Sequence, residues 1–184
     1  MDGLPAGCAL IEVHVGELKQ LFNSMDPTPF RARDLDPRAE EFIAGWASEL
    51  HANVPLGLVV HVDQAAVSPD EAAVLEEAVR EFFKQRAVVT RRRLRQLLQV
   101  GRTSLLIGIA ALAASIVLGD IGSSMLAHTR FGGIFRESLL IGGWVAMWRP
   151  LEVFLYDWWP VRAEARRFDR LGDMAVRIVP SAGQ

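Results

Sequence analysis

Two long apolar segments lie near the middle of the chain. Residues 104–119 read SLLIGIAALAASIVLG without a charge, and the segment becomes long enough to cross about 30 Å of hydrocarbon when it is extended back to Leu97. The second segment begins at Ser138 with SLLIGGWVAMW and continues through RPLEVFLYDWW to Trp159. Its first half alone is too short to cross a bilayer.

The pattern predicts a transmembrane hairpin over 101–160, with spans at about 99–119 and 138–159 and an external loop over 120–137. A buried helical hairpin of a soluble protein is the alternative. Aromatic residues and arginines near the ends of the segments favour the membrane interpretation.

The arginines also predict the orientation of the hairpin. Six precede the first span: Arg86, Arg91, Arg92, Arg93, Arg95 and Arg102. Four follow the second span: Arg162, Arg166, Arg167 and Arg170. The connecting loop has only Arg130 and Arg136. By the positive-inside rule both flanks, and with them both termini, are cytoplasmic. The first fifteen residues also lack a basic start followed by an apolar run, so we expect no secretory signal.

Three short segments outside the hairpin alternate between apolar and polar residues, as strands do: 10–15, 58–62 and 174–179. Between the first two, Asp36 and Pro37 open a helix. Its expected apolar face consists of Phe42, Ile43, Trp46 and Leu50. We expect residues 1–68 and 161–184, from both chain ends, to form one small cytoplasmic α/β domain.

A long helix should connect this domain to the first span. Ser68 is its expected cap, and Glu71 is placed to bond back to the cap. The helix is expected over 69–100 as a cytoplasmic amphipathic segment that continues into the membrane. A helix over about 151–171 should leave the membrane beside it. The predicted fold class is therefore an α+β membrane protein: a two-helix transmembrane hairpin with long cytoplasmic helix extensions and a small cytoplasmic α/β domain of about three short strands.

Charge and cysteine content exclude several kinds of partner. The 184 residues include 20 Lys plus Arg against 22 Asp plus Glu, and this balance does not favour nucleic-acid binding. Cys8 is the only cysteine, so neither an internal disulfide nor a thiolate metal cluster is possible. We expect no cofactor.

Polar residues of the first two strands could form a metal site. Glu12, His14, His61 and Asp63 could converge on one sheet face, and imidazole with carboxylate is a suitable ligand set for zinc. The alternative, which we favour because no dense local motif is present, is that the two histidines pair across the ladder.

Charged residues interrupt the second span, and two of them are the most informative charges of the chain. Arg149 and Glu152 are three positions apart and can pair on one helix face. Charges at this depth normally face a bundle interior, because exposure to hydrocarbon is costly. The alternative is that Arg149 extends toward the cytoplasmic headgroups while Pro150 bends the helix.

Small residues recur at a spacing of four on both spans, which permits close packing of helices in lipid. On the second span they are Ser138, Gly142 and Ala146; on the first they are Ala110 and Ala114, and likewise Ala111 and Ser115. That small residues are simply common in membrane helices is the alternative for the first span.

Two stretches carry a resemblance to a known group of proteins. They are GGWVAMWRPLEVFLYDWWP (142–160) and LKQLFNSMDPTPFRARDLDPRAEEFIAGWASEL (18–50). Together they resemble a family of small bacterial inner-membrane proteins of unassigned function with two transmembrane helices. The resemblance implies a bacterial inner-membrane location and the same two-span layout. It supplies no activity, substrate or site residue.

These observations favour a non-enzymatic protein that assembles with copies of itself in the lipid bilayer. In this interpretation the small-residue stripes join the spans, and the cytoplasmic domain acts as a scaffold or sensor for an unidentified protein partner. Two spans of one chain enclose no pathway. The alternative is an oligomeric channel for ions or a small solute, lined near Arg149 and Glu152.

Overall fold

The structure is a computed structural model that describes residues 7–22, 34–51, 54–63, 68–126 and 131–180. The chain divides into two compact units. The sheet unit comprises Met1–Thr90 and Ala163–Gln184, and the hairpin unit comprises Arg91–Arg162. The termini themselves, for which we predict a cytoplasmic location, lie outside the described residues.

The sheet unit contains a three-stranded parallel sheet in the order β1-β2-β3. Its strands are β1 (Ala9–Val15), β2 (Leu56–Val62) and β3 (Ala175–Pro180). The three predicted strands are confirmed to within one or two residues, and so is the return of the C-terminal strand to the N-terminal part of the chain. Parallel neighbours need a crossover connection. Between β2 and β3 that connection contains the whole hairpin unit.

The two predicted helix starts are confirmed. The side chain of Asp36 accepts a hydrogen bond of 2.9 Å from the backbone N–H of Arg38, and α1 (Pro37–Glu49) begins at the proline. The backbone N–H of Ser68 donates to the carboxylate of Glu71 at 3.3 Å. From there α2 runs without a break over Pro69–Met125, as the sequence predicts, and passes through both units.

The apolar face of α1 differs from the prediction. Ile43 and Ala47 are buried, whereas Phe42 and Trp46 are 46% and 48% exposed. The spacing of the large apolar residues does not decide which side of the helix is buried. The smaller Ala47, one turn after Ile43, completes the buried face. Phe42 and Trp46 instead contact each other on the surface, with ring centroids 6.3 Å apart.

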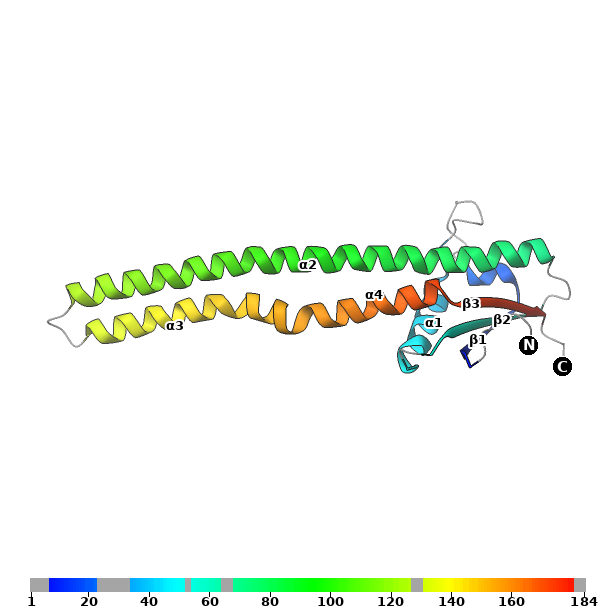
Figure 1. Cartoon of the computed structure of the whole chain (residues 1–184), viewed down its shortest axis with the longest axis horizontal. Coiled ribbons are helices and arrows are strands. Elements are labelled where there is room, and N and C mark those ends of the chain that lie inside the picture. The colour runs from blue at the N-terminus through cyan, green and yellow to red at the C-terminus, as the bar shows by residue number, and fades with distance from the viewer. Residues whose placement is uncertain (1–6, 23–33, 52–53, 64–67, 127–130, 181–184) are drawn as a thin grey trace. The chain divides into compact units, whose positions relative to one another are not determined.

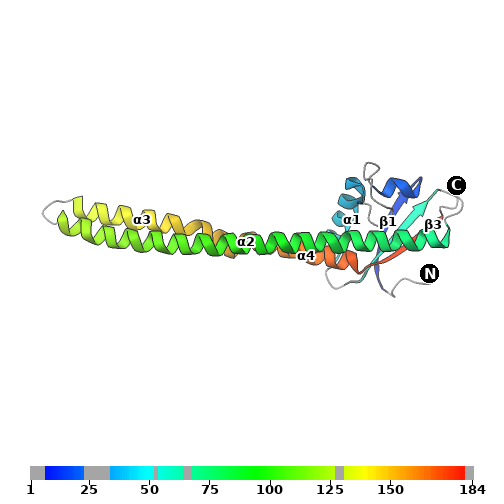
Figure 2. The same ribbon diagram turned by 90° about the horizontal axis from the view of Figure 1, so that it is seen from above.

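The core of the sheet unit lies between the sheet and the surrounding helices (Figure 1). Leu58, Val60 and Val62 of the central strand are fully buried. The first turns of α2 run alongside the sheet in both views (Figures 1 and 2) and bury Leu75, Val79, Phe82 and Phe83 there. Phe168 of α4 (Trp158–Gly172) stacks on Phe83 with ring centroids 6.3 Å apart. Burial of these side chains stabilises the unit by about 1.5 to 3 kcal/mol each.

In the hairpin unit α2 and α3 (Phe131–Glu152) lie side by side in both views (Figures 1 and 2). A π-helix, η3 (Val153–Asp157), follows α3 and leads into α4. Helices occupy most of residues 120–137, for which we predict a position outside the membrane: α2 extends to Met125 and α3 begins at Phe131. Residues 127–130 of that loop lie outside the described residues.

Two helices are long and apolar enough, by length and composition, to cross a membrane. In their most apolar windows only 11% and 17% of the residues are buried inside the chain. The core helix of a soluble protein would be mostly buried. The hairpin unit instead exposes large apolar side chains, among them Leu106, Ile107, Val145 and Trp148, each more than 60% exposed.

Candidate functional site

Glycines bring α2 and α3 into close contact in the hairpin unit. A β-carbon added at Gly143 would lie 2.9 Å from Leu112 Cδ1 and 3.1 Å from Leu112 Cα. One added at Gly108 would lie 3.1 Å from the carbonyl oxygen of Ala146. This carbonyl is the one that Pro150, four residues later, leaves without its helical donor. Gly108 therefore lets the backbone of α2 approach the point where the ladder of α3 is interrupted.

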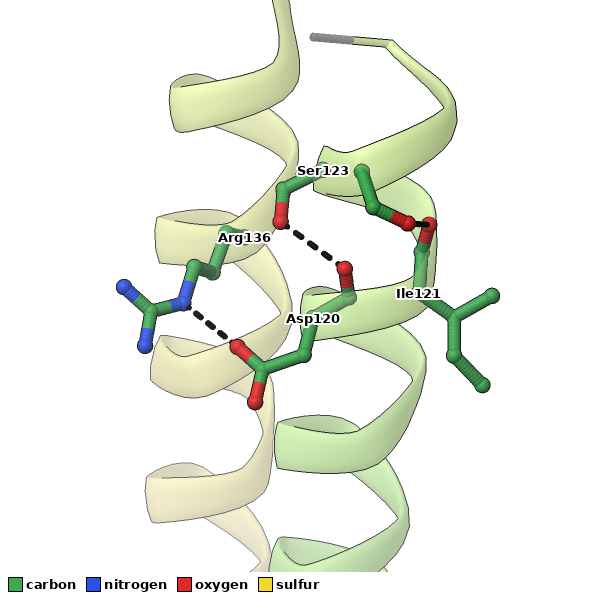
Figure 3. Close-up of polar contacts among 5 residues, drawn as sticks. Asp120, Ile121, Ser123 and Arg136 are labelled. Carbon is green, nitrogen blue, oxygen red and sulfur yellow. Dashed lines mark hydrogen bonds and ion pairs between the residues drawn. The ribbon is translucent and has the colours of Figure 1, made fainter.

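A polar contact joins the two helices near the predicted outer end of the hairpin (Figure 3). Arg136 Nε of α3 donates to Asp120 Oδ1 of α2 at 2.9 Å. Gly119, next to the aspartate, makes room for the stem of Arg136, because a β-carbon there would lie 3.3 Å from Arg136 Cγ. Both charged side chains are more than half exposed. Their attraction stabilises the hairpin only modestly in water.

One of the predicted small residues lies within the close contact of α2 and α3: Ser115 Cβ would be 3.0 Å from a β-carbon placed on Gly143. The other predicted stripes lie outside it. Ser138, Gly142 and Ala146 are exposed on α3, and nothing lies within 4 Å of a β-carbon placed on Gly142. Ala110 and Ala114 are likewise exposed on α2. The stripe of Ser138, Gly142 and Ala146 and the pair of Ala110 and Ala114 are therefore left free by the fold of the single chain, while Gly108, Ser115 and Gly143 make the contact within the hairpin.

Arg149 and Glu152 form the predicted ion pair, and the structure adds a third charged residue. Arg149 Nη1 donates to Glu152 Oε2 at 3.0 Å and lies 3.6 Å from Asp157 Oδ2. Trp148 Nε1 donates to the other carboxylate oxygen of Glu152 at 3.0 Å. We call these three charged residues the ionic cluster. Its formal charge is −1, and the Arg149 side chain is 67% exposed.

The π-helix explains how Asp157 reaches the ionic cluster. Eight positions separate Asp157 from Arg149, and in a regular α-helix the position seven residues on would align better. A π-turn accommodates one additional residue. Asp157, at the end of η3, consequently occupies the aligned place. Trp158 Nε1 donates to the carbonyl of Phe154 at 2.8 Å and so satisfies one acceptor within the irregular turn.

A shallow groove runs along the outer face of α3, the face turned away from α2. Its volume is about 550 Å³, and its lining consists of Ile141, Trp144, Val145, Trp148, Arg149 and Glu152. Trp144 and Trp148 are 60% and 67% exposed. The groove is thus apolar and aromatic along one part and ends on the ionic cluster. An exposed patch of this kind marks a contact with lipid or protein.

The four candidate metal ligands do not converge. His14 and His61 are register partners, and their rings stack with centroids 4.4 Å apart. His61 Nε2 lies 3.6 Å from Glu12 Oε2, and Asp63 has no contact with them among the described residues. Within that part of the chain, no three His, Cys, Asp or Glu side chains are placed to hold a metal ion. The histidines therefore pair across the ladder, as in the alternative that we favour from the sequence.

No family model, no curated protein and no solved structure matches this chain.

Two features of the site do not follow from the sequence pattern that we used. Asp157 is missing from the prediction because a period of 3.6 residues places it off the face of Arg149. The contact within the hairpin is visible in a different spacing: Gly101, Gly108, Ser115 and Gly122 recur every seven residues on α2. A repeat of seven is typical of helices that pack along each other.

Proposed function

We propose that this chain is a non-enzymatic, homo-oligomeric protein of the bacterial inner membrane that acts as a scaffold or sensor through its sheet unit. Both termini are cytoplasmic in this proposal, and the family resemblance remains part of it. The exposed apolar surface of the hairpin unit supports membrane insertion. Reporter fusions at Met1 and Gln184 test the orientation, and a periplasmic signal from either end contradicts it.

The outward position of the ionic cluster is the observation that supports the proposed homo-oligomer. Charged groups in the hydrocarbon region normally face a bundle interior or water, because exposure to lipid costs several kcal/mol. Within the single chain, Arg149 uses only Nη1 for its contacts with the two carboxylates, and its side chain stays largely exposed. A second copy packed against this face shields the charges from lipid and offers partners to the remaining donors.

The free stripes support the same conclusion. The stripe of Ser138, Gly142 and Ala146 flanks the groove, and its small side chains permit a close approach of a neighbouring helix. Trp144 and Trp148, which line the groove, offer large rigid surfaces of the kind enriched at protein interfaces. The proposed interface therefore combines close helix packing, aromatic contact and a shared ionic cluster.

A channel is the second candidate, and the same position of Arg149 and Glu152 favours it. These charges point away from α2, so they can line a pathway only between several copies. Flux through reconstituted protein distinguishes the two proposals. A scaffold or sensor gives none, whereas a channel requires that substitution of Arg149 change conductance or ion preference even where assembly survives.

A matched pair of glycine variants tests the proposed interface. Gly142 and Gly133 are both exposed on α3, and a β-carbon at either has nothing within 4 Å inside the chain. Their separation of nine residues places them on opposite sides of the helix. We expect Gly142→Leu to weaken the oligomer in detergent or nanodiscs and Gly133→Leu to leave it intact. Equal effects of the two substitutions would argue against an interface at the stripe.

A further inference from the structure

The sheet unit contains a cavity of about 510 Å³ at the edge of the sheet where β2 and β3 begin. Its walls come from the segment before β2, from α2, from the end of α4 and from the start of β3. The charged lining residues are Arg80, Lys84, Arg170 and Asp173. Three cations against one carboxylate give the lining a formal charge of +2, and the volume is typical of small-molecule sites.

Arg80 has two long ion pairs but, among the described residues, no hydrogen-bond acceptor close to its guanidinium. Its Nε is buried and has no hydrogen-bond partner. Its terminal nitrogens lie 3.8 Å from Glu76 and 3.9 Å from Glu77, beyond hydrogen-bond distance, and neither glutamate lines the cavity. A buried donor left unsatisfied destabilises the folded protein. The terminal nitrogens belong to a side chain that is 35% exposed, so they can donate to an anionic ligand in the cavity.

The other two cations are held in place by the fold. Arg170 Nη2 donates to the carbonyls of His51 and Val54 at 3.0 and 2.9 Å, which leaves its Nε and Nη1 for other acceptors. Gly172 lets the end of α4 close on α2, because a β-carbon there would lie 2.8 Å from Lys84 Cγ. Lys84 has no ion-pair partner among the described residues, so its ammonium group is available at the cavity wall.

We propose that this cavity binds a phosphate monoester, supplied either by a small soluble metabolite or by a lipid headgroup. A phosphate monoester carries a charge of about −1.5 to −2 near neutral pH, which matches the lining, whereas a single carboxylate leaves an excess of positive charge. The planar guanidinium forks of Arg80 and Arg170 suit two phosphate oxygens, and Lys84 adds a compact charge. Binding itself is independent of assembly. Its role as the input of a sensor rests on the proposed function.

The lysine content of the chain makes a sensitive test possible. The chain has only two lysines, Lys84 at the cavity and Lys19 in the 3-10 helix Leu18–Leu21, and both are exposed. Acylation rates of both amines in the full-length protein are measured by mass spectrometry. In one arm glycerol 3-phosphate is added to protein in phosphatidylcholine nanodiscs. In the other the nanodiscs contain phosphatidic acid, which bears the same phosphate group.

We expect Lys84 to be protected and Lys19 to react at an unchanged rate, because a bound phosphate covers the Lys84 amine and holds its proton. At a concentration ten times the dissociation constant the protection should be about tenfold. Protection by glycerol 3-phosphate identifies a soluble ligand, and protection only by phosphatidic acid identifies a lipid headgroup. Absence of protection in both arms, or equal protection of the two lysines, would overturn the proposal.

Variants test the location of the site. Their affinity is measured by calorimetric titration with the probe that protects Lys84 from acylation. Lys84→Gln and Arg80→Gln should each weaken binding by about tenfold or more, as expected for loss of a charge-assisted hydrogen bond. Lys19→Gln, the same change at the other lysine, should leave it unaltered. Lys84→Gln replaces an exposed side chain and spares the core, so unchanged affinity in this variant contradicts the site. The oligomer mass, measured on the same samples, separates failure of this site from failure of the proposed assembly.

Discussion

Asp157 Oδ2 lies 3.6 Å from Arg149 Nη1, although eight residues separate the two in the chain. The π-helix between them brings the carboxylate to the face on which Glu152 already binds the same nitrogen. The arginine is therefore contacted by two acids on its own helical segment. This arrangement leaves an exposed cluster with an excess negative charge rather than a closed neutral pair.

The ionic cluster predicts non-additive effects on assembly. In an oligomer that buries it, Arg149→Leu leaves two carboxylates without their cation, and removal of one partner of a fully buried pair costs about 3 to 5 kcal/mol. Arg149→Leu with Glu152→Leu removes one charge of each sign, so assembly should recover in part. The dissociation constant of the oligomer, measured over the double-mutant cycle, gives the coupling.

Asp157 limits how far assembly recovers in the double variant Arg149→Leu with Glu152→Leu. Addition of Asp157→Leu to the double variant should restore assembly further, because it removes the last uncompensated acid of the cluster. Additive effects throughout the cycle would instead indicate that Arg149 extends to the headgroups and acts as an interface anchor.

The close contact within the hairpin predicts a position-specific effect of a single methyl group. Gly143→Ala places a β-carbon 3.1 Å from the backbone Cα of Leu112, which cannot move aside as a flexible side chain can. We expect a loss of about 1 to 3 kcal/mol in the stability of the hairpin. Gly133→Ala, with nothing within 4 Å, should be neutral or slightly stabilising, since alanine favours helix. Thermal unfolding in detergent compares the two, and equal stabilities would exclude the close contact.

The parallel pairing of β3 with β2 predicts that the sheet unit depends on its C-terminal strand. Truncation after Gly172 removes β3 together with the buried side chains of Met174 and Val176. The thermal transition of the sheet unit should then be strongly lowered or lost. A control truncation that removes only residues 181–184, beyond β3, should preserve it. An unchanged transition in the longer truncation would contradict the observed sheet.

The stacked histidines predict a protein that purifies without stoichiometric zinc. His14 and His61 face each other ring to ring, and the nearest carboxylate contact, from Glu12, is to His61. Zinc requires three or four ligands, and among the described residues no three His, Cys, Asp or Glu side chains are placed to hold a metal ion. Metal analysis of the purified full-length protein checks this. One equivalent of zinc that disappears in His14→Ala or His61→Ala would reverse the interpretation.

Much of the fold could be predicted because local patterns and global structure agree. Alternation marked the three strands, and the caps at Asp36 and Ser68 located two helix starts. The parallel direction of the strands was not predictable in this way, because alternation is the same for either direction. Phe42 and Trp46 lie outside the buried face of α1, in contrast to the prediction, because residue size alone does not decide which side of the helix is buried.

The candidate site could be predicted in part. The pair of Arg149 and Glu152 follows from a spacing of three on a regular helix, and the structure contains it. The contact of Asp157 with Arg149 could not be predicted, because it depends on the π-helix and the spacing of apolar residues does not indicate where a π-helix forms. The cavity at Lys84 could not be predicted without the tertiary structure, because its four charged residues come from α2 and from the chain around the end of α4.

The mass of the assembled protein is the most direct test of the proposed homo-oligomer. The full-length chain is extracted from membranes in mild detergent or in nanodiscs. Its mass is then measured by native mass spectrometry, with the mass of bound lipid resolved. We expect a mass of two or more 20.4 kDa chains, which is retained on dilution and is reduced in Gly142→Leu but not in Gly133→Leu. A single 20.4 kDa chain with no associated subunit, in the same native lipid, would contradict the proposal.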